Sequence, residues 1–346
     1  MKNIYDLLVS EQKLHARFKL LTGSNLFEPA RNIVENICNR FDDKDGNFIK
    51  DFQSTGFDAR LWEIYLFIFL FENNFEQIDD VNRPDFHVQK NGYDFFIEAS
   101  LSAEKEDERY SREFIKEAVK KNDLKIQKEL IDYYSIRLGS VLYSKLNKRY
   151  WELDWVKGKP LILAVTPSHN YISKFIPDAK IMEYLYGIKI TSEEIEGLLL
   201  NAKNEAVEEH IHEGKIIPSN FFSQPDTENI SAVIFSNNCD LHKFNRMGFE
   251  HNLSKRDLII IRSGYEYDDS KPNAKAKDFT HQVKKGEVTE NWAESLTIYH
   301  NPNAKIKLDS NIFENVKQIW VNEKGEFDGI MTKKFVFHSI TIASEM

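Results

Sequence analysis

Cysteine is scarce in this chain of 346 residues, which contains only Cys38 and Cys239. Two cysteines so far apart do not indicate the disulfide framework of small secreted proteins, and they agree with a reducing compartment. The N-terminus lacks the apolar core of a signal peptide. The longest apolar run, residues 61–71, is eleven residues long and too short to cross a bilayer. We therefore expect a cytoplasmic protein that does not enter a membrane.

The sequence also lacks the glycine-rich motifs of nucleotide-binding enzymes. It contains neither a Walker loop nor a dinucleotide fingerprint, and no internal repeat. The net charge of -9 argues against a protein that coats nucleic acid, although a local positive patch would be enough for a nucleic-acid enzyme. A hydrophobic content of 41% with 13% aromatic residues is typical of a globular chain with a packed interior.

Hydrophobic periodicity divides the chain into three regions. Residues 1–50 have helical stripes and predict a helical N-terminal segment. Residues 51–170 predict the order helix, two strands, helix and strand, which is typical of an α/β core with a mixed central sheet. Residues 171–346 predict a C-terminal α+β extension packed on that core. Apolar runs predict buried strands at residues 161–165 and 231–235 and a further strand at residues 258–261. Residues 296–299 and 335–343 are predicted to be strands that finish the sheet or form an accessory one.

Turn and cap signals add further expectations for the C-terminal region. A capping box from Thr191 to Glu194 predicts a helix that Gly214 ends. Residues 236–248 are predicted to form a polar loop directly after a strand, where loops often line functional sites. Residues 271–285 carry five lysines against one acid and predict a flexible basic loop.

The stretch from Arg83 to Ser100 places acids in an apolar context. Two short apolar runs flank a Lys90–Gly92 turn, a pattern that predicts a β-hairpin. Asp85 opens the first run and Glu98 lies near the end of the second. Acids in such surroundings are costly unless a positive charge compensates them. A divalent cation is the simplest compensation, because hard cations bind carboxylate oxygens.

Two further charged residues lie on apolar helices. Glu63 is the single charge in the most apolar part of a helix predicted over residues 57–71. It either pairs with an arginine such as Arg60 or belongs to the hairpin site. Lys145 borders the apolar stripe of a helix predicted over residues 130–153. Its ammonium group either reaches solvent or reaches the same site.

Asp85 and Glu98, with twelve residues between them, resemble the core motif of the PD-(D/E)XK nuclease superfamily, which has the restriction-endonuclease-like fold. The resemblance covers roughly residues 55–165. It implies a metal-dependent endonuclease that hydrolyses phosphodiester bonds, with DNA as the expected substrate, in bacterial defence or DNA processing. Residues 243–248 also resemble a segment of a group of bacterial proteins, and no function follows from that second resemblance.

The same resemblance implies the site residues. Asp85 and Glu98, with Glu63 and the carbonyl of Ala99, would hold one or two Mg²⁺ or Mn²⁺ ions. The superfamily has a catalytic lysine two residues after the second acid, where this chain has Ser100.

Relocated lysines occur in the superfamily, and Lys145 is the first candidate for that role and Lys148 the second. Four residues are candidate substrate contacts: Ser100, Lys148, Lys243 and Arg246. A homodimer is compatible with a double-strand cut.

Two alternatives stay open. A degenerate member of the same fold would bind nucleic acid or a protein partner without cutting, and Ser100 supports this interpretation. A hydrolase or transferase of another class would use Cys239 or His242 in the polar loop at residues 236–248.

Overall fold

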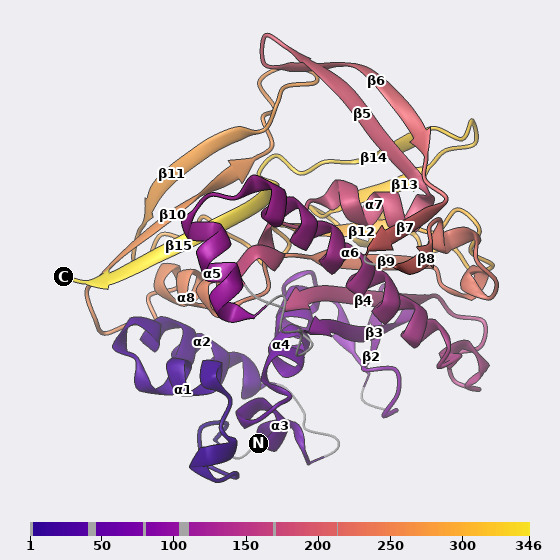
Figure 1. Cartoon of the computed structure of the whole chain (residues 1–346). Coiled ribbons are helices and arrows are strands. Elements are labelled where there is room, and N and C mark those ends of the chain that lie inside the picture. The colour runs from indigo at the N-terminus through magenta and orange to yellow at the C-terminus, as the bar shows by residue number, and fades with distance from the viewer. Residues whose placement is uncertain (1–2, 41–45, 79–80, 104–110, 169–170, 213) are drawn as a thin grey trace.

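A mixed sheet of eight strands runs through the molecule in the order β1-β2-β3-β4-β9-β12-β13-β14 (Figure 1). The computed structural model describes residues 3–40, 46–78, 81–103, 111–168, 171–212 and 214–346. The strands of the sheet are β1 (Glu76–Gln77), β2 (Phe86–Lys90), β3 (Tyr93–Ala103), β4 (Leu161–Ser168), β9 (Ala232–Ser236), β12 (Leu296–His300), β13 (Lys317–Val321) and β14 (Phe327–Ile330).

Strand directions confirm the mixed α/β class predicted from the sequence. β2 and β3 form an antiparallel hairpin, and β3, β4 and β9 run parallel to one another. β12 is antiparallel to β9, and β13 is parallel to β12. Strands from both sides of residue 170 thus belong to one sheet, so the expected boundary at that residue does not divide the sheet.

Helices cover both faces of the sheet. They are α1 (Ala16–Gly23), α2 (Glu28–Cys38), α3 (Phe48–Gln53), α4 (Phe57–Glu72), α5 (Arg112–Lys120), α6 (Leu124–Leu146), α7 (Asp178–Tyr186) and α8 (Leu241–Glu250). Helices α1 to α4 and α8 share one hydrophobic core with the sheet, and α5, α6 and α7 share another. Along β4, Ile162 and Ala164 belong to the first core and Leu163 to the second, because successive strand residues face opposite sides.

The apolar helix predicted over residues 57–71 is confirmed as α4, whose side chains are buried along most of its length. A helix that is apolar on all sides is stable only inside a protein. The predicted helix over residues 130–153 is observed as α6, which begins and ends earlier. It ends before Arg149, which has a left-handed backbone (φ 52°). In the part of the chain that the structure describes, no helix is long and apolar enough to cross a membrane.

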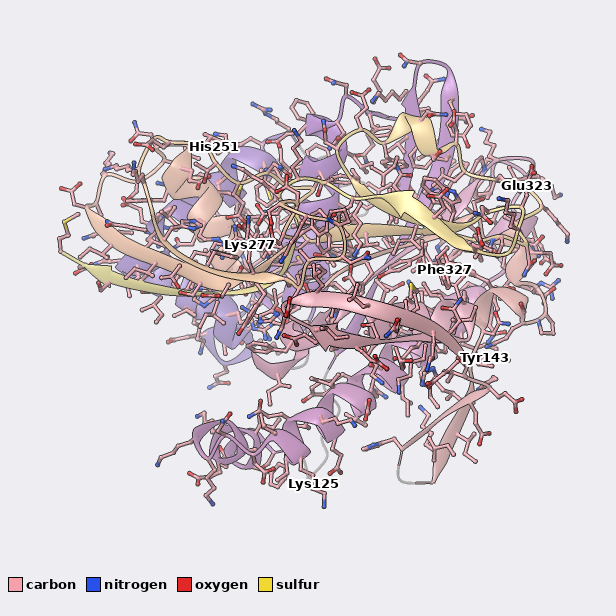
Figure 2. All side chains as sticks on the ribbon, turned by 90° about the horizontal axis from the view of Figure 1, so that it is seen from above. Lys125, Tyr143, His251, Lys277, Glu323 and Phe327 are labelled. Carbon is pink, nitrogen blue, oxygen red and sulfur yellow. The ribbon has the colours of Figure 1, made fainter. Side chains whose placement is uncertain are left out.

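A smaller antiparallel sheet lies beside α8, formed by β11 (Lys277–Val283), β10 (Leu258–Glu266) and β15 (Val336–Glu345). Seen from above, His251 after α8 and Lys277 on β11 lie toward one side of the molecule, and Glu323 and Phe327 toward the other (Figure 2). The small sheet and the β13–β14 hairpin therefore lie on opposite sides of the protein.

The helix predicted from Thr191 to Gly214 is wrong. The chain forms two ribbons there: β5 (Ile188–Ile195) with β6 (Leu198–Ala206), and β7 (Glu209–His212) with β8 (Lys215–Pro218). Glu196 and Gly197 join β5 to β6, and both have positive φ angles (51° and 74°). A two-residue turn with two positive φ angles matches the twist of a hairpin, and this turn outweighs the local capping box.

Two predicted loops are also regular elements. The loop predicted at residues 236–248 is largely α8, because the Asp240 carboxylate accepts a hydrogen bond from the Lys243 N–H (2.9 Å) and caps the helix. The basic loop predicted at residues 271–285 contains β11. Four of its five lysines form ion pairs with acids, as Lys275 does with Glu194 (3.0 Å).

Candidate active site

The β2–β3 hairpin brings Asp85 and Glu98 together. Phe86 pairs with Ile97 across the hairpin, so Asp85, one residue before β2, lies alongside Glu98. The backbone N–H of Ala99 donates to the Asp85 carboxylate (Oδ2, 2.8 Å). The Asp85 side chain thus accepts the hydrogen bond that a backbone carbonyl of β2 would accept if the hairpin were longer. Beyond this point β3 pairs only with β4 among the described strands. The two acids therefore lie at the point where β2 ends.

Lys145 supplies a positive charge to this point. Its ammonium group forms an ion pair with Glu98 (Oε1). Helix α6 packs on the sheet face that carries Phe96 and Glu98, with Leu142 and Leu146 buried in the same core. Residues three and four apart lie on one side of a helix, so Lys145 borders the packed face. Of the two positions expected for this ammonium group, the structure has the one beside Glu98.

Ser100 lies two residues beyond Glu98, and its side chain faces the same side of the sheet. It is buried, with 4% of its surface exposed. Its hydroxyl oxygen has no hydrogen-bond partner among the residues that the structure places. A serine side chain is too short to replace a lysine here, so the cation beside Glu98 comes from a helix far along the chain.

Tyr150 is a site residue that the sequence pattern did not reveal. It lies in the 3₁₀ turn Tyr150–Glu152, just after α6, and its hydroxyl donates to the Glu98 carboxylate (2.9 Å). Its position four residues beyond the helix end gives no sequence signal, because the direction of the chain there depends on the left-handed Arg149.

Glu63 on α4 has the partner that one sequence interpretation anticipated. Its carboxylate pairs with Arg60 (2.7 Å), which also binds Asp51 (2.8 Å). Burial raises the pKa of Glu63, the Arg60 charge lowers it, and the Glu98 charge raises it further. Glu63 is therefore close enough to the hairpin acids to interact with them electrostatically, while Arg60 offsets part of its charge.

Negative charge at this site exceeds positive charge. Burial, followed by the charges of Glu98 and Glu63, raises the pKa of Asp85 to about 8, against the opposing effects of Lys145 and the Ala99 N–H. Lys145 and Arg60 are two cations beside three acids. A divalent cation would favour the ionised carboxylates and suits their hard oxygen donors. The donor set therefore fits Mg²⁺ or Mn²⁺.

Each acid already has a protein partner. Glu98 contacts Lys145 and Tyr150, Asp85 accepts from Ala99, and Glu63 pairs with Arg60. Within the described ranges, no three His, Cys, Asp or Glu side chains are grouped so that they could hold a metal ion. Cation binding would consequently exchange some of these contacts for metal ligation.

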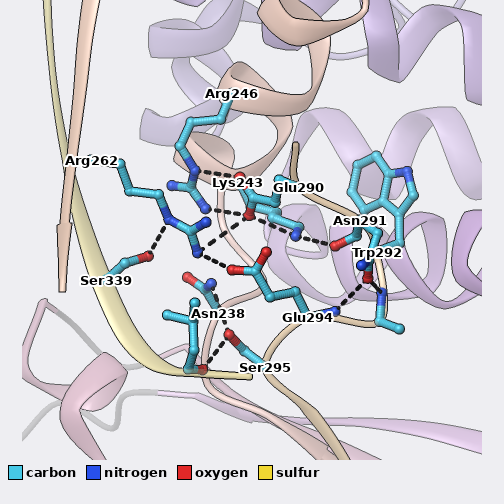
Figure 3. Close-up of polar contacts among 12 residues, drawn as sticks. Asn238, Lys243, Arg246, Arg262, Glu290, Asn291, Trp292, Glu294, Ser295 and Ser339 are labelled. Carbon is cyan, nitrogen blue, oxygen red and sulfur yellow. Dashed lines mark hydrogen bonds and ion pairs between the residues drawn. The ribbon is translucent and has the colours of Figure 1, made fainter. Parts of the chain in front are cut away.

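Lys148 is exposed on the surface, so it remains accessible to a ligand. Lys243 and Arg246 are not, since 0% and 1% of their surfaces are exposed. Both bind Glu290, Lys243 at 2.7 Å and Arg246 at 2.7 Å (Figure 3). Arg262 on β10 joins the same network through Glu290 (3.5 Å) and also pairs with Glu294 (2.6 Å). The expected substrate contacts of Lys243 and Arg246 are therefore replaced by a structural role between α8 and the small sheet.

Cys239 and His242 lack the geometry of a nucleophile and its base. The Cys239 thiol lies 3.8 Å from the Leu61 carbonyl oxygen, and burial raises its pKa well above the ordinary value. A thiol that keeps its proton is a poor nucleophile. No hydrogen bond joins the two side chains in the described structure, so a thiol hydrolase at this position is not supported.

Comparisons of the chain with protein-family models, with curated proteins and with solved structures give no match. Any functional argument therefore depends on the geometry and chemistry of the site.

Proposed function

We propose that this protein is a metal-dependent nuclease that hydrolyses phosphodiester bonds, with DNA as the expected substrate. The observation that carries the proposal is the ion pair between Lys145 and Glu98 beside Asp85. This ion pair brings a lysine to two carboxylates at the end of a hairpin. The chain has Ser100 at the position where the superfamily motif has its lysine. This combination of charges is suited to activating water and to stabilising a phosphate.

Asp85 and Glu98 would hold Mg²⁺ or Mn²⁺ together with the Ala99 carbonyl, and Glu63 would be a third acidic contributor. The chemistry that the cation supplies when bound is a lower pKa for water and neutralisation of charge on the scissile phosphate. The carboxylates of the protein contribute only when ionised. Arg60 supports this state at Glu63 by lowering its pKa.

Lys145 has the role of stabilising negative charge that develops on the phosphate. Its ammonium group carries three donors, one of which contacts Glu98. Tyr150 holds the Glu98 carboxylate through its hydroxyl (2.9 Å) and limits the carboxylate's rotation. Lys145 and Tyr150 thus act from one helix end on one carboxylate of the hairpin.

A nuclease-shaped protein that binds nucleic acid or a protein partner without cutting is the second candidate. It is favoured by the observation that Lys145, Tyr150, Arg60 and the Ala99 N–H already satisfy the acids. In this interpretation the Lys145–Glu98 pair is a structural ion pair.

A cleavage assay distinguishes the two candidates. Supercoiled plasmid, linear duplex, single-stranded DNA and RNA are incubated with the protein and Mg²⁺ or Mn²⁺, with and without chelator. We expect chelator-sensitive cleavage that falls by about 100-fold or more in Asp85→Asn and Glu98→Gln. Asp154→Asn is the matched control, because Asp154 lies near Tyr150 in sequence but its side chain is 90% exposed.

Two outcomes would contradict the proposal. If Asp85→Asn and Glu98→Gln cut as fast as the parent protein, the hairpin acids do not carry the reaction. If the folded parent protein cuts none of these substrates with either cation, the non-cleaving candidate replaces the nuclease.

A further inference from the structure

A second cavity, separate from the acidic site, opens at the carboxyl ends of the parallel strands β3, β4 and β9. Its volume is about 220 Å³, and Leu101, Ser168 and Asn237 line it from the ends of these strands. Neither the hairpin acids nor Lys145 belong to its walls. In open α/β sheets, ligands bind in crevices outside the carboxyl ends of parallel strands. The position of the cavity therefore points to a ligand.

Two cations from different elements face this cavity. Arg17 on α1 contacts Asp58 (2.6 Å) and Ser168 (2.6 Å), in both cases through Nη1. Nε and Nη2 of Arg17 make no hydrogen bond to any residue that the structure describes. Lys174, in the 3₁₀ turn Tyr171–Phe175, forms an ion pair with Asp240. Both side chains keep donors that a ligand can use.

His242, near the start of α8, lies among several cations. Burial and the charges of Lys174, Arg246 and Arg17 lower its pKa to about 3, so the imidazole is neutral. Burial and the two arginines also lower the pKa of Lys174 to about 7. Asp58 and Asp240, the partners of Arg17 and Lys174, also line the cavity. An anion placed there would relieve the repulsion among the cations.

The His242 ring is also an unused hydrogen-bonding group. Its Nδ1 atom is buried and has no hydrogen-bond partner within the described residues. The ring packs against Phe27 (centroids 5.4 Å apart). Buried polar atoms without partners are costly, so a donor or acceptor supplied by a ligand would stabilise this position.

We propose that the cavity binds a small phosphate monoester through Arg17, Lys174 and His242. These three groups come from three separate elements, an arrangement that suits the tetrahedral oxygens of a phosphate better than the two oxygens of a carboxylate. Phe27 and Leu61 give the cavity an apolar wall for the organic part of the ester. Pockets for drug-sized ligands have volumes of about 300–1,000 Å³, so this cavity takes a smaller molecule.

Calorimetric titration of the full chain tests the proposal with ribose 5-phosphate, AMP and inorganic phosphate as probes. Ribose, adenosine and acetate are the neutral and carboxylate comparisons. We expect at least one of the two phosphate esters to bind. Arg17→Gln and Lys174→Met each weaken this binding by about tenfold or more, as expected for the loss of a charge-assisted hydrogen bond. Arg149→Gln is the control, because Arg149 is half-exposed and lies outside the cavity.

Asp85→Asn should bind the ester as the parent protein does, which separates this site from the proposed nuclease site. Circular dichroism of each variant verifies folding, and Arg17, with 40% of its side chain exposed, is the substitution least expected to disturb it. The proposal is overturned if neither ester binds, if ribose or acetate binds equally well, or if folded Arg17→Gln retains full affinity. Loss of ester binding in Asp85→Asn would also overturn it, by moving the ligand to the acidic site.

Discussion

Two groups of buried charges in this protein differ in their balance. At the hairpin, Asp85 and Glu98, with Glu63 nearby, outnumber their lysine, and the pKa of Asp85 rises to about 8. In the interior cluster (Figure 3), Lys243, Arg246 and Arg262 surround Glu290 and Glu294. There the arginine and lysine charges hold the pKa of Glu290 well below its ordinary value, against the effect of burial.

The balance of buried charges distinguishes a structural cluster from a candidate functional site. In the interior cluster three cations accompany two acids, so each buried carboxylate is compensated. Such a cluster holds elements together, although removing one member is costly. A site whose charges do not match retains a need for an external ion or substrate, and perturbed pKa values in such places indicate functional sites. The following experiments test whether this difference in balance is real.

The largest expected effect is on the interior cluster. Glu290→Gln leaves Arg246 and Lys243 without their carboxylate, and we expect a loss of about 3–5 kcal/mol in the free energy of unfolding. Urea unfolding followed by circular dichroism measures it. Glu228→Gln, which removes the exposed pair with Lys305 (3.0 Å), should cost about 1 kcal/mol or less. Equal effects in the two variants would show that the cluster is not special.

At the hairpin, by contrast, removing an acid is expected to raise the free energy of unfolding. The pKa of Asp85 is higher in the folded protein (about 8) than its ordinary value of 3.8, so the folded state binds the proton more tightly than the unfolded state. The parent protein then loses stability as the pH rises from about 4 to 8. Asp85→Asn removes this dependence.

Urea unfolding at several pH values between 5 and 9, in the presence of chelator, measures the difference between parent and variant. The advantage of Asp85→Asn should grow with pH and level off above pH 8. If the variant is less stable than the parent by the same amount at every pH, the Asp85 charge is compensated and the site is balanced after all.

A divalent cation bound at the hairpin should compensate the negative charge of Asp85 and Glu98. Mn²⁺ or Mg²⁺ at 100 times its dissociation constant would stabilise the folded protein by about 2.7 kcal/mol, visible as a higher melting temperature. Glu98→Gln should lose most of this gain, whereas Asp154→Asn should keep it. A gain that is identical in Glu98→Gln would place the cation elsewhere.

The smallest expected effect concerns Tyr150. Tyr150→Phe removes one hydrogen bond to the Glu98 carboxylate, and we expect a loss of about 1–2 kcal/mol in unfolding free energy. It should also slow cleavage without abolishing it, since Lys145 still contacts Glu98. Tyr143→Phe is the control, because Tyr143 is 52% exposed near the end of α6, the helix that precedes Tyr150. If both variants lose the same unfolding free energy and cleavage rate, Tyr150 does not position Glu98.

Much of the fold followed from local patterns. The apolar run of α4, the Lys90–Gly92 turn and the continuous strand β4 each carry a signal within about ten residues, and each is observed. The β5–β6 ribbon was missed because a capping box and a hairpin turn occur in the same stretch. Its turn at Glu196 and Gly197 prevailed, and α7 and a contact between Leu198 and Ala274 support the ribbon.

The functional candidates divide in the same way. The positions of Asp85 and Glu98 depend on hairpin register, which the period of two and the turn length determine locally. The sequence also favoured Lys145, because it borders an apolar stripe. It also offered Lys243 and Arg246 as candidate substrate contacts, and nothing in residues 236–248 indicated that both would be buried.

By itself, the sequence determined that two acids face each other at the end of a hairpin, because strand pairing over fourteen residues is a local matter. Only the tertiary structure decided which cations accompany which acids. Lys145 and Glu98 are 47 residues apart, and Arg246 and Glu290 are 44 residues apart. The packing of α6 and α8 brings these pairs together, because a charge buried by packing is stable only beside its counter-charge.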